Sequence, residues 1–199
     1  MPVETLALPL LVGLIAVALF FDFLNGLHDA ANAIATIVAT RVLRPHHAVA
    51  WAAFFNFIAF LFFGLHVAET IGTGIVDAEI VDARVIFGAL VGAIAWNIIT
   101  WWRGIPSSSS HALVGGILGA GTVKAGIGAI VWSGLGKTVA AIVLSPLLGM
   151  ALALLLVFAV SWIFARSTPF AVDRSFRIMQ FFSASAYALG HGGNDAQKT

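Results

Sequence analysis

The sequence predicts an all-α fold of the polytopic transmembrane class. Of its 199 residues, 60% are hydrophobic and only 10% are charged, and the mean hydropathy is +1.01. A soluble domain carries roughly 25% charged residues, so a soluble protein is excluded. The apolar runs are long and nearly continuous, whereas a membrane β-barrel alternates apolar and polar residues in segments of about ten. The net charge of +1 and the absence of cysteine give no indication of nucleic-acid binding or of disulfides.

Four apolar windows approach the 20 or so residues that a helix needs to cross a bilayer. Residues 25–40 continue the first window with small and polar residues, so we expect one discontinuous helix over 6–40 that breaks around Asn25 and Gly26. The N-terminus has no basic residue before its apolar stretch, which favours a first span over a cleaved signal. The four windows are residues 6–24, 46–67, 84–102 and 138–164.

Residues 107–136 have a different composition from the four windows. They are rich in glycine and serine and follow Pro106, which favours two half-helices or a re-entrant hairpin. The orientation of the chain follows from its arginines, because Lys and Arg gather in short cytoplasmic loops. This rule places residues 41–46 and 103–105 in the cytoplasm and the acidic segment 68–83 outside.

A short pattern of Gly, any residue, a polar residue, Asp and Ala occurs twice, at residues 26–30 and 192–196. Each copy follows an apolar stretch in which a carboxylate is energetically expensive. Five predicted crossings separate the two copies, and an odd number gives the second copy the opposite direction. The sequence therefore predicts an inverted repeat, with residues 1–165 as the first repeat and 166–199 as a cytoplasmic loop and the start of the second. The counterpart of the serine-rich segment would lie beyond Thr199, so we expect this chain to be part of a longer protein.

The first copy of the pattern belongs to a polar stripe on one helix face, formed by Asp22, Asn25, Asp29, Asn32 and Thr36. A carboxylate within the membrane must pair, take up a proton or bind a cation. Oxygen ligands of this kind suit a hard cation or a proton relay. The alternative is that the stripe only forms hydrogen bonds between helices, but the two aspartates favour a functional site.

The second candidate site is a run of four serines and a histidine that follows Pro106. This run is typical of a helix N-cap and first turn, where free backbone N–H groups attract anions without a fixed positive charge. The alternatives are an ordinary helix cap or a flexible linker. The histidine is either a proton site or a buried, hydrogen-bonded side chain. The residues are Ser107, Ser108, Ser109, Ser110 and His111.

Three motifs together resemble the inorganic phosphate transporter (PiT) family, particularly its bacterial low-affinity members. They are "FDFLNGLHDAANAIAT" (21–36), "PSSSSHALVGG" (106–116) and "GHGGNDAQKT" (190–199). The resemblance implies an inverted-repeat transporter in a cell membrane, in bacteria the inner membrane. This sequence departs from many eukaryotic members, which have Gly-Ala-Asn-Asp at positions 26–29 and a glutamate in place of Asn56. The resemblance to the bacterial form implies proton coupling.

The resemblance also assigns residues. For cation coupling it implies Asp29, Asn32 and Asp195, and the polar stripe adds Asp22 and Asn25 to this set. The substrate-binding set comprises the serine run together with the polar residues of the second copy: Ser107, Ser108, Ser109, Ser110, His111, Asn194, Gln197 and Thr199.

The function that we predict is symport of inorganic phosphate with a cation, either H⁺ or Na⁺, the phosphate moving alone or as a complex with a divalent metal. No other cofactor and no enzymatic activity are expected. The expected partners are phosphate, membrane lipid, the remaining C-terminal half of the transporter and, in a homodimer, a second copy. Two alternatives remain: a cation or proton channel that uses the aspartate stripe, and an intramembrane serine hydrolase that uses Ser110, His111 and Asp29.

Overall fold

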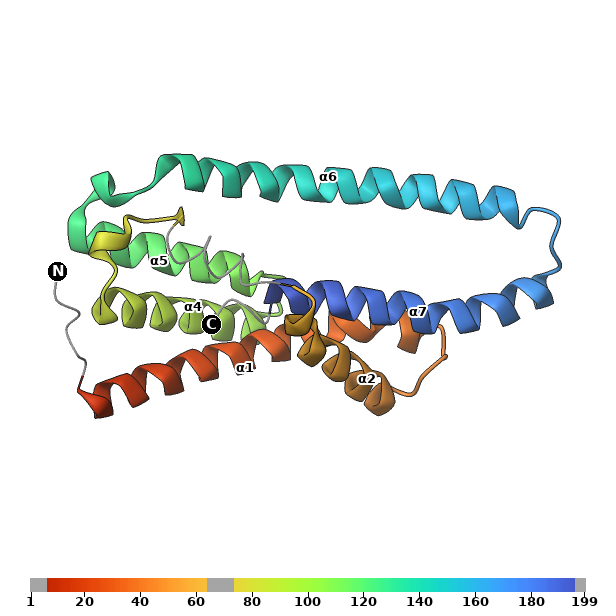
Figure 1. The fold of residues 1–199 in the computed structure, drawn as a ribbon, viewed down its shortest axis with the longest axis horizontal. Coiled ribbons are helices and arrows are strands. Elements are labelled where there is room, and N and C mark those ends of the chain that lie inside the picture. Colours follow the sequence, from red (N-terminus) through yellow and green to blue (C-terminus); the bar gives the residue numbers. More distant parts are fainter. Residues whose placement is uncertain (1–6, 64–73, 196–199) are drawn as a thin grey trace.

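The computed structural model describes residues 7–63 and 74–195, and this part of the chain is almost entirely helical (Figure 1). Three of its helices, α1, α4 and α6, are long and apolar enough to cross a membrane. The predicted all-α, multi-pass fold class is therefore confirmed. The elements are α1 (Leu8–Ala39), α2 (Pro45–Ile58), η1 (Ala59–Leu61), η2 (Ala78–Ile80), α4 (Ala83–Arg103), α5 (Ser109–Ala125), η3 (Ile127–Ala129), α6 (Trp132–Ile163) and α7 (Pro169–Asp195).

Helix α1 takes part in two separate apolar cores. Its N-terminal half lies against the pair α4 and α5, where Phe21 is buried in one cluster with Ala93 and Leu113. Its C-terminal half lies against α2 and α7, where Ala33 and Ile37 are buried among small side chains of both helices. Small residues let membrane helices approach closely, so van der Waals packing can hold them together where lipid supplies no hydrophobic driving force. Asn25 and Asp29 of the polar stripe lie between the two cores, whereas Asn32 and Thr36 lie at the level of the second core.

The predicted break of α1 at Asn25 and Gly26 is wrong, because the helix is continuous through both residues. Each backbone group that a break exposes to hydrocarbon costs several kcal/mol, whereas a glycine inside a helix costs only about 1 kcal/mol relative to alanine. A cap after the break would also be needed, and the ring of His28 instead bonds within the helix, from Nδ1 to the carbonyl oxygen of Leu24 at 2.9 Å. Continuity is therefore the cheaper solution.

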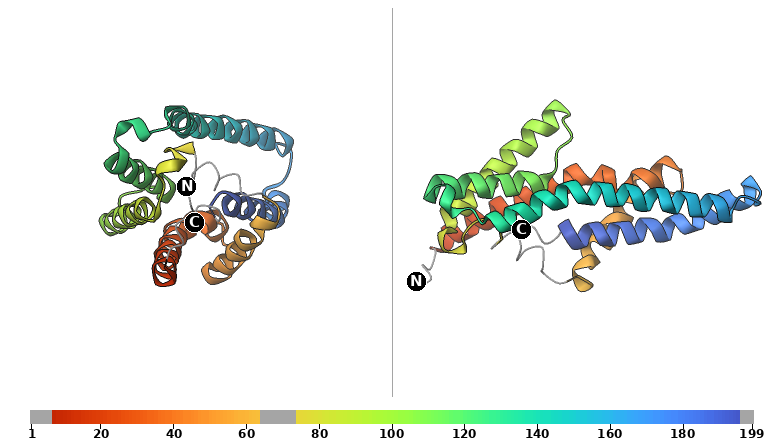
Figure 2. Two further views of the ribbon diagram at one scale, coloured as in Figure 1. Left: turned by 60° about the vertical axis from the view of Figure 1, so that its left-hand side comes forward. Right: turned by 90° about the horizontal axis from the view of Figure 1, so that it is seen from above.

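The chain is interrupted instead between α4 and α5, which form an antiparallel hairpin. Its turn, residues 104–108, lies near the middle of the long axis in two views (Figures 1 and 2). Gly104 ends α4 with a φ of 63°, a left-handed conformation that favours glycine. Pro106 then disfavours a helical conformation for the residue before it, and Ser108 caps the start of α5.

This hairpin corrects two predictions. Residues 107–136 do not form two half-helices or a hairpin of their own, because they contain the single helix α5, a short 3-10 turn and the start of α6. Residues 103–105 do not lie with the loop 41–46 at one end of the molecule, since the turn lies near the middle of the long axis (Figure 1). The charge rule failed here because Arg103 ends a helix that stops part-way along this axis.

Helices α1 and α7 run in opposite directions along the long axis (Figure 1), which is the arrangement that an inverted repeat requires. The predicted crossings differ in detail. In the window 46–67, the described residues form only the 14-residue α2 and η1, and residues 64–67 lie outside the described part. Helix α6 begins at Trp132, and none of its residues is buried. The repeat itself stays a prediction.

Substitution of Gly116 tests the packing of the hairpin. A Cβ atom at this position would lie 2.4 Å from the carbonyl oxygen of Ala89, a backbone atom that cannot rotate away. We expect Gly116→Ala to destabilise the purified protein in detergent by about 1–3 kcal/mol. The matched control is Gly115→Ala, where a Cβ meets nothing within 4 Å. Equal melting temperatures for the two variants would contradict this description of the α4–α5 contact.

Candidate functional site

The serine cluster, residues 107–110, forms the turn before α5 and its first residues. Ser108 is the N-cap, and its hydroxyl oxygen accepts a hydrogen bond from the backbone N–H of His111 at 3.4 Å. The predicted N-cap is therefore confirmed. The first backbone N–H groups of a helix have no carbonyl partner within it. Those of Ser109 and Ser110 carry the positive end of the helix dipole, which favours an anion by about 0.3–1 kcal/mol at an exposed site.

Two hydroxyls of the cluster are bonded to other helices. The indole N–H of Trp96 on α4 donates to Ser107 Oγ at 3.0 Å. Ser109 donates its hydroxyl proton to Asn25 Oδ1 on α1, and both side chains are buried. The hydroxyl of Ser109 therefore fixes the start of α5 on α1. Ser108 and Ser110 are half-buried, and in the described part of the chain neither hydroxyl bonds to another helix.

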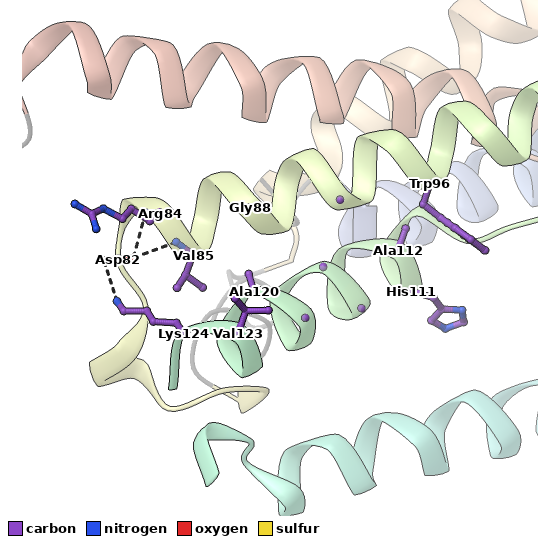
Figure 3. Close-up of a pocket in the computed structure, with 14 residues that line it drawn as sticks. Asp82, Arg84, Val85, Gly88, Trp96, His111, Ala112, Ala120, Val123 and Lys124 are labelled. Atoms are coloured by element: carbon purple, nitrogen blue, oxygen red, sulfur yellow. Dashed lines mark hydrogen bonds and ion pairs between the residues drawn. The ribbon is translucent and has the colours of Figure 1, made fainter. Parts of the chain in front are cut away.

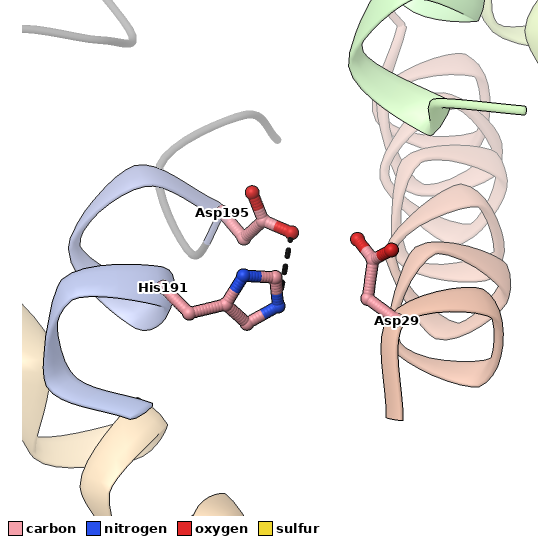
Figure 4. A group of neighbouring side chains, drawn as sticks. All are labelled: Asp29, His191 and Asp195. Atoms are coloured by element: carbon pink, nitrogen blue, oxygen red, sulfur yellow. Dashed lines mark ion pairs between the residues drawn. The ribbon is translucent and has the colours of Figure 1, made fainter. Parts of the chain in front are cut away.

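Asp29 and Asp195, one from each copy of the repeated motif, meet across α1 and α7. His191 lies beside them. One possible metal-ligand atom from each of the three side chains, a carboxylate oxygen or an imidazole nitrogen, lies within 4.8 Å of the other two (Figure 4). His191 Nε2 is 3.4 Å from Asp195 Oδ2, one helical turn away on α7. All three side chains are half-buried. We refer to these three residues as the carboxylate cluster.

Glycines at the end of α7 allow this approach. Gly192 lies so close to α2 that a Cβ atom would be 2.6 Å from the Cα of Asn56. Asp29 and His191 line a cavity of about 240 Å³ between α1, α2 and α7. Asn56 also lines this cavity, and its buried Oδ1 atom has no hydrogen-bond partner among the described residues. The cavity thus combines carboxylate, imidazole and amide groups, which can hold a proton or a small cation.

The other predicted site residues are more dispersed. Asp22 is half-buried on α1, while Asn32 and Asn194 are exposed. His111 is exposed, so the interpretation as a buried histidine is wrong. Thr36, the last residue of the stripe, is also exposed, and Gln197 and Thr199 lie outside the described residues.

Sequence reasoning missed His191. A signal was available, because His191 and Asp195 are four residues apart and therefore share a helix face. In the first copy of the motif the histidine, His28, comes immediately before the aspartate, so the histidines of the two copies do not align. His28 instead bonds to its own helix.

A larger groove, of about 920 Å³, lies between α4 and α5 (Figure 3). Glycine and alanine line its middle, and its charged groups lie at the end of the hairpin farther from the turn. There Lys124 Nζ is 2.8 Å from Asp82 Oδ2 and donates to the carbonyl oxygen of Ile80 at 2.7 Å. Because this lysine is already bonded, it offers little to an anion. The smaller cavity, which Asp29 and His191 line, is the better candidate site.

Asp82 is also the N-cap of α4, where its Oδ1 atom accepts from the backbone N–H groups of Arg84 and Val85. The hydrogen bond from Lys124 and the one from Val85 lower the pKa of Asp82 below its ordinary value. The same contact pairs the positive charge of Lys124, near the end of α5, with the negative charge of Asp82.

Comparison with known proteins identifies similar sequences and a similar structure. The sequence model of the phosphate transporter family matches residues 25–175. The chain is 75% identical over 195 residues to a probable low-affinity inorganic phosphate transporter of Rhizobium meliloti, an alignment that covers 98% of this chain and 58% of the relative. It is 48% identical to a protein of the same description from Streptomyces halstedii, over 93% of this chain and 87% of the relative.

A solved structure described as the sodium-dependent phosphate transporter is also similar. Its TM-score is 0.73 at 26% sequence identity, and the match covers 91% of this chain and 55% of that one. The low-affinity inorganic phosphate transporter PitB of Escherichia coli is 33% identical, with 95% of this chain and 44% of the relative covered. The chain thus spans about half the length of several relatives that it matches.

The Asp82 site gives a pH-dependent prediction. Because its pKa is lowered in the folded protein, the ionised carboxylate stabilises the fold above the ordinary aspartate pKa of about 3.9, and this contribution is lost as pH falls through the lowered value. Asp82→Asn keeps a capping oxygen but removes the ion pair, whereas Asp82→Ala removes both. We expect melting temperatures at pH 7 in the order wild type, Asn variant, Ala variant, with the first two converging below about pH 4. A constant difference between them at all pH values would contradict the role of the ion pair.

Proposed function

This chain belongs to the phosphate transporter family, and we propose that it forms the first repeat and the start of the second repeat of a symporter for inorganic phosphate and a cation. Residues 1–165 form the first repeat in this proposal, and residues 166–199 form the cytoplasmic loop and the start of the second. The protein is a multi-pass membrane protein, and its relatives are transporters, so an enzymatic function is not favoured. The remaining half would supply the second set of phosphate-binding residues.

The phosphate site in this proposal is the start of α5. Phosphate oxygens accept hydrogen bonds from the free N–H groups of Ser109 and Ser110, with the hydroxyl of Ser110 beside them. None of these donors carries a formal charge, and the exposed His111 lies at the edge of the site. Neutral donors bind an anion reversibly, which suits a transporter that must release its substrate on the other side. Asn194, Gln197 and Thr199 would complete the site from the second motif.

The cation site is the carboxylate cluster, with Asn32 and Asp22 on the same stripe of α1. The observation that carries the proposal is the approach of one donor atom each from Asp29, His191 and Asp195 to within 4.8 Å. Moving an anion into a negative cell costs roughly 2.3 kcal/mol per charge per 100 mV, and a co-transported cation offsets this cost. The described sodium dependence of the solved relative supports Na⁺ as one candidate, and the imidazole supports H⁺ as the other. A complex of phosphate with a divalent metal is the third form in which the substrate could arrive.

The two sites are neighbours along α1. Asn25 bonds to Ser109 at the phosphate site, and Asp29 is one helical turn farther along the same face. A rise of 1.5 Å per residue puts their Cα atoms about 6 Å apart. Ions bound beside these two residues would be close enough for each ion to lower the electrostatic cost of binding the other.

The two alternatives fit the site less well. A serine hydrolase needs a base in hydrogen-bond contact with its nucleophile, but Ser110 and His111 are adjacent helical residues whose side chains point apart. A cation channel would use the carboxylate cluster but leave the anion-binding start of α5 without a role. Cation currents in liposomes that persist without phosphate would favour the channel.

Asp29→Asn is the direct test of the cation site. The substitution keeps the size of the side chain and removes its charge, so we expect uptake of radiolabelled phosphate by the full-length transporter to fall at least tenfold in a transport-deficient host, a change of about 1.4 kcal/mol. Asp195→Asn should act in the same way. The control is Asp173→Asn, since Asp173 is an exposed residue of α7 that pairs with Arg177. Wild-type uptake by both cluster variants would eliminate the proposed role.

A further inference from the structure

Three polar side chains on three different helices are almost completely buried. The exposed fractions are 4% for Asn25 on α1, 1% for Asn97 on α4 and 3% for Ser109 on α5. Burial of a polar group costs free energy unless a hydrogen bond replaces its contacts with water or with the membrane's polar region. Three such groups in the interior of a membrane protein therefore need an explanation.

The helix register places all three at one level. Phe21, Ala93 and Leu113 lie in one apolar cluster, which fixes the relative heights of α1, α4 and α5. Asn25 and Asn97 each follow a member of this cluster by four residues, and Ser109 precedes its member by four residues on the antiparallel helix. One turn beyond the apolar cluster, the three helices thus bring their polar residues to the same depth. We call Asn25, Asn97 and Ser109 the polar layer.

Within the polar layer, Asn25 and Ser109 are bonded to each other, but Asn97 has no partner. Neither its Oδ1 nor its Nδ2 atom makes a hydrogen bond to any described residue. The Ser109 hydroxyl donates to Asn25 and can still accept from another donor. An amide N–H of Asn97 is the donor that the register places at the same level.

We propose that Asn25 and Asn97 are positioning residues for the phosphate site, and this inference rests on the proposed function. Asn25 fixes the first turn of α5 on α1 through Ser109. Asn97 donates to the Ser109 hydroxyl when phosphate occupies the start of α5, so the free energy lost by its unpaired amide is recovered on binding. Neither asparagine touches the phosphate; both act by orienting the N–H groups of Ser109 and Ser110.

The proposal predicts that stability and affinity change in opposite directions in Asn97→Leu. Leucine has nearly the same size, and replacing an unpaired buried amide with an apolar group removes its desolvation cost. We expect the melting temperature of the full-length transporter in detergent, without phosphate, to rise by about 2 °C. The KM for phosphate uptake in proteoliposomes should rise roughly fivefold or more, with the maximal rate retained. A higher or unchanged melting temperature with an unchanged KM would overturn the role of Asn97.

Thr100→Val is the matched control for Asn97→Leu. Thr100 is also 1% exposed on α4, and among the described residues its hydroxyl bonds to the carbonyl oxygens of Trp96 and Asn97 in its own helix. The exchange removes a buried polar group of similar size outside the polar layer. We expect the phosphate KM to stay within twofold of wild type. A rise as large as that of Asn97→Leu would show a general effect of α4 packing and overturn the proposal.

A swapped pair tests Asn25 even if Asn97→Leu fails to fold. Asn25→Ala and Ser109→Ala should each raise the phosphate KM, and the double alanine variant should be no worse than either one. The exchange Asn25→Ser with Ser109→Asn restores a bond across the same gap and should return KM to within about threefold of wild type. A swapped protein as impaired as the double alanine variant would refute positioning through this bond. No phosphate uptake by wild type would instead remove the proposed function, and the inference with it.

Discussion

The arrangement of the molecule depends on the continuity of α1. This single helix of 32 residues packs its two halves into different apolar cores, and the intervening polar segment lies between them. Backbone hydrogen bonds cannot be replaced by lipid, so a break in the exposed part of α1 would be costly. Because α1 is continuous, it fixes the distance between the hairpin of α4 and α5 and the pair of α2 and α7. The start of α5 and the end of α7 are both placed by their contacts with this helix.

The polar groups between the two cores are held by different kinds of contact. The hydroxyl of Ser109 is buried and bonded to Asn25, so it holds α5 against α1. The backbone N–H groups of the first turn of α5 have no carbonyl partner within the helix and can bind an anion. The carboxylates of Asp29 and Asp195 approach from separate helices, with His191 beside them. A carboxylate pair at this distance repels unless a proton, a cation or an imidazolium lies close by. The charge of this region is therefore tied to what it binds.

Sequence reasoning found the parts of the site better than the shape of the chain that holds them. The helix cap at Ser108 was predictable because capping depends on local residue types, and the meeting of Asp29 with Asp195 followed from a repeated motif and its direction. The predicted break at Asn25 and Gly26 was wrong because the low helix propensity of one glycine does not break a helix whose two halves are both packed against other helices. The turn at Gly104 and Pro106 was placed at the cytoplasmic side because an arginine lay beside it. Asn97 could not be found at all, since an asparagine in an apolar helix gains meaning only from the level at which its neighbours pack.

The charges at the proposed site would also impose an order of binding. If phosphate binds at the start of α5 as proposed, it lies about one helical turn from Asp29, and two unit charges roughly 8 Å apart interact by about 2 kcal/mol at an effective dielectric constant of 20. Without a cation, two ionised carboxylates at that distance would therefore oppose a singly charged phosphate by about 4 kcal/mol, close to a thousandfold in affinity. The anion-binding helix start offers only about 0.3–1 kcal/mol through its dipole, which does not overcome this repulsion. If the two ions share this region, the cation or proton must bind before the phosphate, and the coupling of their movement follows from that order.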